Sequence, residues 1–298
     1  MKKFLLFVAC LFVAFVMLNI FYLWILPKVD LDFKKTKEAA GFRGEKNKII
    51  VLGNSTALDG INSEMLTAQF GGAHNLAVGG ATLITNYIQL KSYLETNAKP
   101  DKVLLFLSSG NNDYDTTHEV NPIVSYYYQH VVYEKPLKDL PLFRFRWLFI
   151  ENMKKLFSGA HRSAYLLKGQ FRSDKIVVDQ TILKQGTMCS EINYLHPGFE
   201  YLRRMAELCD SNEIRFIVFE IPCWNESQNN LADTEVKFPL LKPMHIYNLN
   251  RIAICDTLFD SKMDWLSKNH LNYKGSIKLT RAIINVLLKP DIGTAPIN

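Results

Sequence analysis

The most continuous apolar stretch of the chain lies at its N-terminus. Residues 4–26 are apolar apart from Asn19. At about 1.5 Å of rise per residue, a helix of this length crosses a hydrocarbon core of about 30 Å. The run ends in aromatic residues and Pro27 rather than in a small-residue cleavage site, which favours an uncleaved anchor over its alternative, a removed signal peptide. The pattern therefore predicts a transmembrane anchor over residues 1–27, in contact with the lipid bilayer through 4–26.

The segment after the anchor is rich in charge. Residues 28–47 mix basic and acidic side chains, and we expect them to form a flexible spacer. Lys2 and Lys3 precede the apolar run and favour a cytoplasmic N-terminus. The lysines that follow the run favour the opposite orientation and are more numerous: Lys28, Lys34, Lys35 and Lys37. Charge alone therefore leaves the membrane orientation open.

From residue 48 onward, short apolar runs alternate with helical patterns. The runs typical of buried parallel strands are 49–52, which ends before Gly53, then 103–107, 214–221 and, more weakly, 252–255. A helical pattern covers 198–210, where one face carries Phe199, Leu202, Ala206 and Cys209. Strands separated by helices predict an α/β fold, with a doubly wound (flavodoxin-like) parallel sheet flanked by helices. We assign this domain to residues 48–290.

An insertion at about 114–195 interrupts the alternation. It contains the aromatic run 126–128 and the arginine-aromatic run 143–147. The simpler interpretation is an insertion that packs over the sheet. The alternative is a lid or a partner-binding surface, because aromatic residues and arginine dominate many interaction hot spots.

Composition excludes several classes of function. The formal charge of +6 comes from scattered basic residues without a basic stripe, so we expect no nucleic-acid partner. The five cysteines share no metal-ligand spacing and predict neither a metal site nor a full disulfide framework. Cys209, Cys223 and Cys255 lie in apolar stretches typical of buried thiols, although one bridged pair stays open as an alternative.

Two glycine-containing motifs occur in the first half of the domain. Ser55 follows the first strand in Gly-Asn-Ser, where a tight strand-to-helix turn presents a hydroxyl beside a helix N-terminus. The plainer interpretation is a serine that caps a helix. Residues 75–80 end in Gly79-Gly80, a turn that can aim a backbone N–H into a site.

Two further motifs carry a side-chain amide and a histidine. Asn112 lies in Gly-Asn-Asn-Asp after the second predicted strand, where its amide can donate to an oxyanion, although an asparagine-rich turn is the plainer interpretation. His270 lies in Asn-His-Leu-Asn near the C-terminus and is a candidate base for Ser55. A surface-loop histidine is the alternative for this position.

Together these motifs resemble the SGNH (GDSL-type) hydrolase superfamily, which is named for Ser, Gly, Asn and His in four sequence blocks. Ser55, Gly80, Asn112 and His270 match the blocks in family order, and Asn54 replaces the usual Asp of the first block. The resemblance implies Ser55 as nucleophile and His270 as general base and then acid. It also implies an oxyanion hole formed by the backbone N–H groups of Ser55 and Gly80 and by the Asn112 side chain. No metal or organic cofactor is required.

The last block departs from the family pattern. An Asp usually lies three residues before the histidine, and this chain has Ser267 there. Asp264, or less readily Asp260, could reach the histidine from a loop. Otherwise, we expect a Ser–His dyad in which a backbone carbonyl holds the ring.

The combination of an anchor with this domain resembles membrane-tethered proteins of envelope acylation, such as the partner protein of teichoic-acid D-alanylation and alginate acetylation proteins. That resemblance implies a single-pass protein with its domain outside the cytoplasm, periplasmic or at the cell surface. The implied substrate is an acyl ester or an acylated cell-envelope glycan, and the implied partner is a multi-spanning membrane acyltransferase. The alternatives are a broad-range carboxylesterase and a catalytically weak or inactive scaffold for such an acyltransferase.

Overall fold

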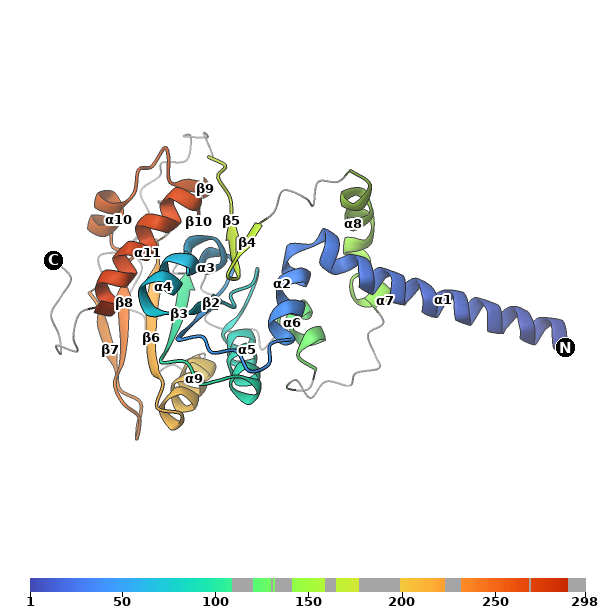
Figure 1. Cartoon of the computed structure of the whole chain (residues 1–298), viewed down its shortest axis with the longest axis horizontal. Coiled ribbons are helices and arrows are strands. Elements are labelled where there is room, and N and C mark those ends of the chain that lie inside the picture. The colour runs from blue at the N-terminus through green and yellow to red at the C-terminus, as the bar shows by residue number, and fades with distance from the viewer. Residues whose placement is uncertain are drawn as a thin grey trace.

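The computed structural model of the chain describes residues 1–108, 120–129, 131, 141–158, 165–176, 199–222, 232–267 and 269–288. Within these residues, six strands form the central sheet in the order β2-β1-β3-β6-β8-β7 (Figure 1). The first five strands in this order are parallel, and β7 is antiparallel to β8. The strands are β1 (Ile49–Gly53), β2 (Ala73–Asn75), β3 (Lys102–Ser108), β6 (Arg215–Ile221), β7 (Thr234–Val236) and β8 (Met244–Asn248). The parallel strands follow the flavodoxin-like order, which confirms the predicted α/β class.

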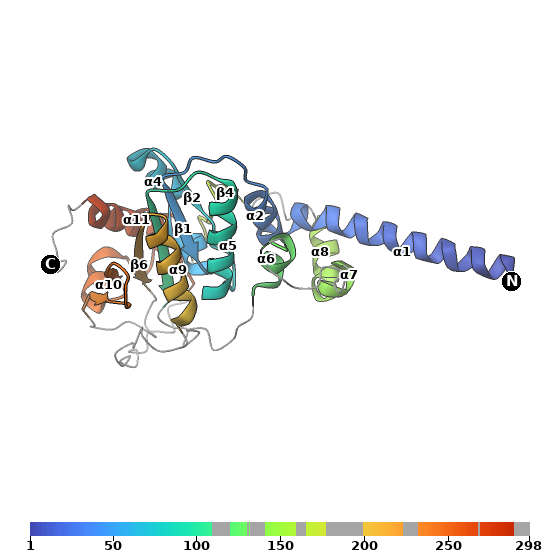
Figure 2. The ribbon, with the colours of Figure 1, turned by 90° about the horizontal axis from the view of Figure 1, so that it is seen from below.

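Helices cover both faces of the sheet and close two hydrophobic cores (Figures 1 and 2). Alternate residues of β1 point to opposite faces, so Ile49 and Val51 enter one core, whereas Ile50 and Leu52 enter the other. The first core includes residues of α3 (Ser55–Gly60), α4 (Ser63–Phe70), α10 (Ile252–Leu258) and α11 (Tyr273–Leu288). The second includes residues of α5 (Leu83–Thr96) and α9 (Glu200–Ser211).

Three of the four strand predictions are confirmed, as β1, β3 and β6. The prediction of a strand at 252–255 is wrong, because these residues begin α10, where Cys255 is the buried position and Ile252 is exposed. The parallel strand beside β6 is β8. Its buried and partly exposed residues alternate, so it does not form a continuous apolar run in the sequence. The amphipathic pattern at 198–210 is confirmed as α9.

An apolar helix, α1 (Lys2–Val29), extends from one end of the molecule away from the sheet (Figure 1). Among the described residues, it is the one helix long and apolar enough to cross a membrane, by criteria that a signal sequence also meets. Its last turns are buried against the rest of the chain at Tyr22, Ile25, Leu26 and Val29. The end of the apolar helix is therefore part of the folded structure.

The expected flexible spacer is instead a folded helix, α2 (Leu31–Ala40). Asp30 caps it, because its carboxylate accepts hydrogen bonds from the backbone N–H groups of Asp32 (3.0 Å) and Phe33 (3.3 Å). The helix buries Phe33, Lys35, Thr36 and Ala39. The prediction of a flexible spacer was wrong because Lys35 and Thr36 are polar, so the buried face of α2 shows no apolar stripe in the sequence.

The described part of the insertion contains α6 (Pro122–Tyr127), α7 (Pro141–Arg144), α8 (Arg146–Ser158) and a hairpin of β4 (Tyr165–Leu167) and β5 (Gln170–Arg172). Its helices do not pack over the sheet as expected. Instead, α7 and α8 pack against α1, and α6 packs against α2 and α5 (Figure 1). The strand β5 packs against α3. The insertion thus connects the apolar helix to the α/β domain.

The prediction of buried thiols is confirmed for two of the cysteines. Cys209 and Cys255 are buried, and Cys10 is exposed on α1. Cys189 and Cys223 lie outside the described residues.

Candidate active site

Ser55 lies at a sharp turn between β1 and α3, at the carboxyl end of the first strand. Gly53 makes the turn with a φ of +151°, and a Cβ there would lie 2.6 Å from the Ala57 Cβ. Asn54 caps the helix, because its Oδ1 accepts hydrogen bonds from the backbone N–H (3.0 Å) and hydroxyl (2.7 Å) of Thr56. Asn54 thus fulfils a local role in the position of the family's Asp. As the first residue of α3, Ser55 has a backbone N–H without an intrahelical acceptor.

A carboxylate on the same helix orients the predicted base. The Asp59 Oδ2 lies 2.6 Å from the His270 Nδ1. His270 comes from β10 (His270–Leu271), which pairs with β9 (Trp265–Ser267) and packs against α3. Asp59 lies four residues after Ser55, so both project from one side of α3. The helix therefore carries both the predicted nucleophile and the partner of the predicted base.

Asp59 is well buried, with 9% of its side chain exposed against 28% for His270. Burial raises the pKa of the Asp59 carboxyl, and the hydrogen bond from His270 and the positive charge of Lys35 oppose that rise. The Asp59 backbone is held as well, because its carbonyl accepts a hydrogen bond of 3.1 Å from the Gln170 amide of β5. An ionised Asp59 accepts the Nδ1–H and leaves Nε2 as the basic nitrogen.

The two acids expected to hold the histidine have other roles. The Asp264 Oδ2 forms an ion pair of 2.5 Å with Lys278 and accepts the Asp260 backbone N–H at 2.6 Å. Asp260 itself is exposed and accepts a hydrogen bond from the Lys262 backbone N–H. Ser267, at the family's Asp position, lies opposite His270 in the β9–β10 register. The expectation of Asp264 or Asp260 as partner is wrong, and so is the alternative of a backbone carbonyl.

Sequence reasoning missed Asp59. Its spacing of four residues from Ser55 was the available signal, because a helix that begins at Ser55 places residue 59 one turn further on the same face. The SGNH pattern instead places the acid close to the histidine in sequence, at the position of Ser267.

The glycine turn of the second motif is tied to α3. The Asn75 amide donates to the Ala57 carbonyl (2.9 Å), and its Oδ1 accepts the Ala77 N–H (2.9 Å). Gly80 has a φ of +63° and is exposed at the turn. Asn121 of the insertion donates to the Gly79 carbonyl at 2.7 Å. The turn that contains Gly80 is therefore anchored both to the helix of Ser55 and to the insertion.

Helix α2 holds the other side of this turn. The buried Lys35 ammonium donates to the Ala77 carbonyl. The Asp32 Oδ1 lies 3.5 Å from the Gly79 backbone nitrogen. Burial lowers the pKa of Lys35 to about 7, against the opposing effects of Asp32 and Asp59. A Cβ at Gly79 would lie 3.0 Å from the Asp32 carboxylate, so any larger residue there would push this carboxylate away from the turn.

Two features of the predicted site remain, the Asn112 motif and the hydrogen bonds of the Ser55 hydroxyl and the His270 Nε2. Asn112 and its motif lie outside the described residues. Neither the Ser55 hydroxyl nor the His270 Nε2 forms a hydrogen bond within the part of the chain that the structure describes. Catalytic hydrogen bonds are often long before substrate binds and tighten in the complex.

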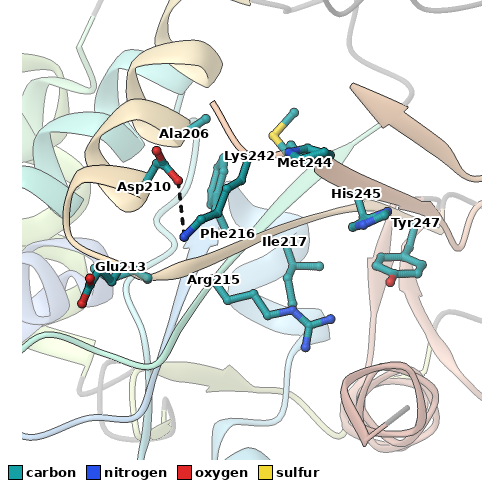
Figure 3. A pocket seen from close by; sticks show the side chains of 12 residues that line it. Ala206, Asp210, Glu213, Arg215, Phe216, Ile217, Lys242, Met244, His245 and Tyr247 are labelled. Carbon is teal, nitrogen blue, oxygen red and sulfur yellow. Dashed lines mark ion pairs between the residues drawn. The ribbon is translucent and has the colours of Figure 1, made fainter. Parts of the chain in front are cut away.

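A cavity of about 330 Å³ lies elsewhere, at the amino ends of β6 and β8 (Figure 3). Arg215 and His245 line it, and an ion pair of 3.8 Å joins Lys242 to Asp210 at its edge. Ser55 follows the carboxyl end of β1, which runs parallel to β3 and β6. The cavity and Ser55 therefore lie at opposite ends of the parallel strands, the cavity at the amino ends and Ser55 at the carboxyl ends.

Comparison with known proteins gives little further information. No protein-family model matches the chain, and no curated protein matches it. Similar solved structures include one from Streptococcus pneumonia that is provisionally named a platelet activating factor. The two chains are 11% identical, the match covers 91% of this chain and 98% of the other, and the TM-score is 0.36. A likeness this low carries no argument about function.

Proposed function

We propose that the chain is a serine-dependent acyl-ester hydrolase or O-acyltransferase of the SGNH type. The observation that supports this most directly is the 2.6 Å contact between Asp59 and His270, on the helix that begins with Ser55. A buried carboxylate that fixes the tautomer of a partly exposed histidine, one turn from a serine at a strand end, supports a role in nucleophilic catalysis.

In the proposed mechanism, the Ser55 Oγ attacks the acyl carbon while its proton passes to the His270 Nε2. The oxyanion accepts hydrogen bonds from the backbone N–H groups of Ser55 and Gly80 and from the Asn112 amide. Collapse of the tetrahedral intermediate expels the alcohol, which takes the proton from Nε2 and leaves the acyl group on Ser55. Water or an acceptor hydroxyl then attacks the acyl carbon while its proton passes to the His270 Nε2. Collapse of this second intermediate breaks the bond to the Ser55 Oγ, which takes the proton back from Nε2, and releases the acid or the new ester. Asp59 stabilises the imidazolium in both halves.

We propose that α1 is retained as a single membrane-spanning anchor. A contact within the fold supports this, because the Tyr22 hydroxyl donates to the Phe145 carbonyl at 3.0 Å. Leu142 likewise donates its backbone N–H to the Asn19 Oδ1 at 3.1 Å. Removal of the helix as a signal peptide would leave this apolar cluster open to water, at a cost in stability.

The substrate we propose is an acyl ester on a cell-envelope glycan outside the cytoplasm, with a multi-spanning acyltransferase as partner. This part of the proposal depends on the resemblance to anchored envelope-acylation proteins. A broad-range carboxylesterase would use the same residues. The alternative that is not an enzyme is a scaffold for such an acyltransferase. A scaffold would not need the Asp59–His270 pair.

The test is reaction of the purified full-length protein in detergent with a fluorophosphonate probe. We expect covalent labelling at Ser55 that is lost in Ser55→Ala and strongly slowed in His270→Ala. Ser63→Ala is the matched control, since Ser63 is buried in the adjacent α4 and should leave labelling intact. A wild-type protein that is folded and not labelled would contradict the proposal and favour the scaffold.

A further inference from the structure

The helix α8 carries large apolar side chains on its exposed side. Trp147 is 58% exposed, Ile150 67% and Phe157 85%. Their spacing places all three on one stripe of the helix, together with the exposed Lys154. A stripe of this kind is unfavourable in water, because burial of each side chain would gain about 1.5–3 kcal/mol.

The opposite side of α8 packs on the end of the apolar helix. The Phe149 and Tyr22 rings pack edge to face with centroids 5.2 Å apart. The loop before α8 also contacts α1, because the Phe145 carbonyl accepts the Tyr22 hydroxyl. Figure 1 shows α7 and α8 beside α1 and away from the sheet.

These contacts fix the depth of α8 relative to the apolar run. Tyr22 lies four residues before Leu26, the last residue of the run, or about 6 Å along the helix axis. If residues 4–26 span the bilayer, the level of Tyr22 is the boundary between acyl chains and headgroups. Helices that lie in this boundary bury their apolar side by about 5–10 Å and carry basic residues at its edge.

We propose that α8 lies in the membrane interface, with Trp147, Ile150 and Phe157 in contact with lipid. Three basic residues and one acidic residue on α8 fit a headgroup region that contains anionic lipid. The lipid contact rests on the proposed role of α1 as a retained anchor. It adds a second attachment, which limits rotation of the protein about the axis of α1.

The test uses full-length protein in vesicles of phosphatidylcholine brominated near the headgroup, which quenches nearby tryptophan. We expect Trp147→Phe to remove a quenched component of the emission. Trp265→Phe is the control, because Trp265 is buried in the domain and its loss should leave the quenched component unchanged. If Trp24→Phe removes quenched emission but Trp147→Phe does not, α1 is inserted and the proposal for α8 is overturned. If neither tryptophan is quenched, the anchor itself is contradicted, and the lipid contact with it.

A second observation, independent of α8, concerns the contacts of α2 with the glycine turn. Lys35 donates to the Ala77 carbonyl, and the Asp32 carboxylate lies at the Gly79 nitrogen. Both contacts fall within three residues of Gly80, whose N–H is assigned to the oxyanion. Only Asp30 separates α2 from α1, so these contacts join the segment that follows the apolar helix to this turn.

We infer that Lys35 is a positioning residue, which holds the oxyanion turn in register with Ser55 and couples the anchor to the site. This inference also rests on the proposed function. A displaced donor can cost about 100-fold in rate. Helix α2 offers a matched control in Lys37, an exposed residue of the same type.

The test compares fluorophosphonate labelling rates of Lys35→Met and Lys37→Met, each measured well below its own unfolding temperature. We expect Lys35→Met to slow labelling by about 10-fold or more, and Lys37→Met to match the wild type. Asp32→Ala tests the second contact if Lys35→Met fails to fold, and it should also slow labelling. Wild-type rates in the folded variants would overturn the inference, whereas an unlabelled wild type would contradict the proposed function instead.

Discussion

The imidazole of His270 and the carboxylate of Asp59 lie 2.6 Å apart, although 211 positions separate them along the chain. The contact joins the β9–β10 hairpin to α3, the helix that follows the first strand. It places the acid of the proposed triad on the helix of the proposed nucleophile, whereas the SGNH pattern places it three residues before the histidine. The chain has Ser267 where the SGNH pattern has its acid. A carboxylate nevertheless reaches His270, from Asp59 on α3.

The first prediction concerns this acid. Asp59→Asn should slow labelling of Ser55 by roughly 10²–10⁴-fold, because an amide in this position no longer fixes the productive tautomer or stabilises the imidazolium. The matched control is Asp264→Asn, which removes the ion pair with Lys278. That variant should lose about 1–3 kcal/mol of stability and keep the labelling rate per folded molecule. Equal labelling rates for the two variants would refute the assignment of Asp59.

The second prediction concerns the turn at Gly53. Gly53→Ala should destabilise the protein by about 3 kcal/mol or more, because the new Cβ would lie 2.6 Å from the Ala57 Cβ and 3.0 Å from the Phe106 carbonyl oxygen. Gly71→Ala is the control. Gly71 also has a positive φ, of +84°, but no atom lies within 4 Å of its Cβ position, so the expected cost is about 1 kcal/mol. Denaturant unfolding in detergent measures both, and similar losses would argue against crowding at Gly53.

The third prediction follows from the burial of Lys35, which lowers its pKa from 10.5 to about 7. Between these pH values the unfolded chain binds more protons at this group than the folded chain does. The contribution of Lys35 to stability therefore rises with pH across that window, by up to about 1.4 kcal/mol per pH unit, and the full cost of burying the charge is present below pH 7.

The measurement is the free energy of unfolding at several pH values for three proteins. The wild type and Lys37→Met should gain stability from pH 7 to 10 relative to Lys35→Met. Parallel curves for all three proteins would mean that Lys35 keeps its ordinary pKa in the folded state.

The fourth prediction concerns the N-terminus. Intact mass spectrometry of protein extracted from membranes should find α1 retained, because its last turns are buried against α7 and α8. Tyr22→Ala should weaken this packing by about 3 kcal/mol, whereas Phe21→Ala, at an exposed neighbouring position, should have little effect. A mature chain that begins near residue 30 would show that the helix is a signal sequence.

Local physics let the sequence determine much of this protein. An apolar run long enough to span a bilayer, three buried strands with continuous apolar patterns, and an amphipathic α9 are all visible within short windows. The turn at Ser55 is local as well, because Gly53 permits the backbone and Asn54 caps the helix.

The tertiary structure alone decided which distant groups meet. Asp59 became the partner of His270 because α3 packs against β10, and no pattern within one segment encodes that contact. Residues 252–255 belong to a helix, and the place beside β6 is taken by β8, which comes before them in the chain. In the sequence, Lys35 is one of several charged residues in the predicted spacer. It is buried because α2 packs beside the glycine turn. Local periodicity specifies elements, but burial and charge pairing depend on neighbours that the fold brings from far along the chain.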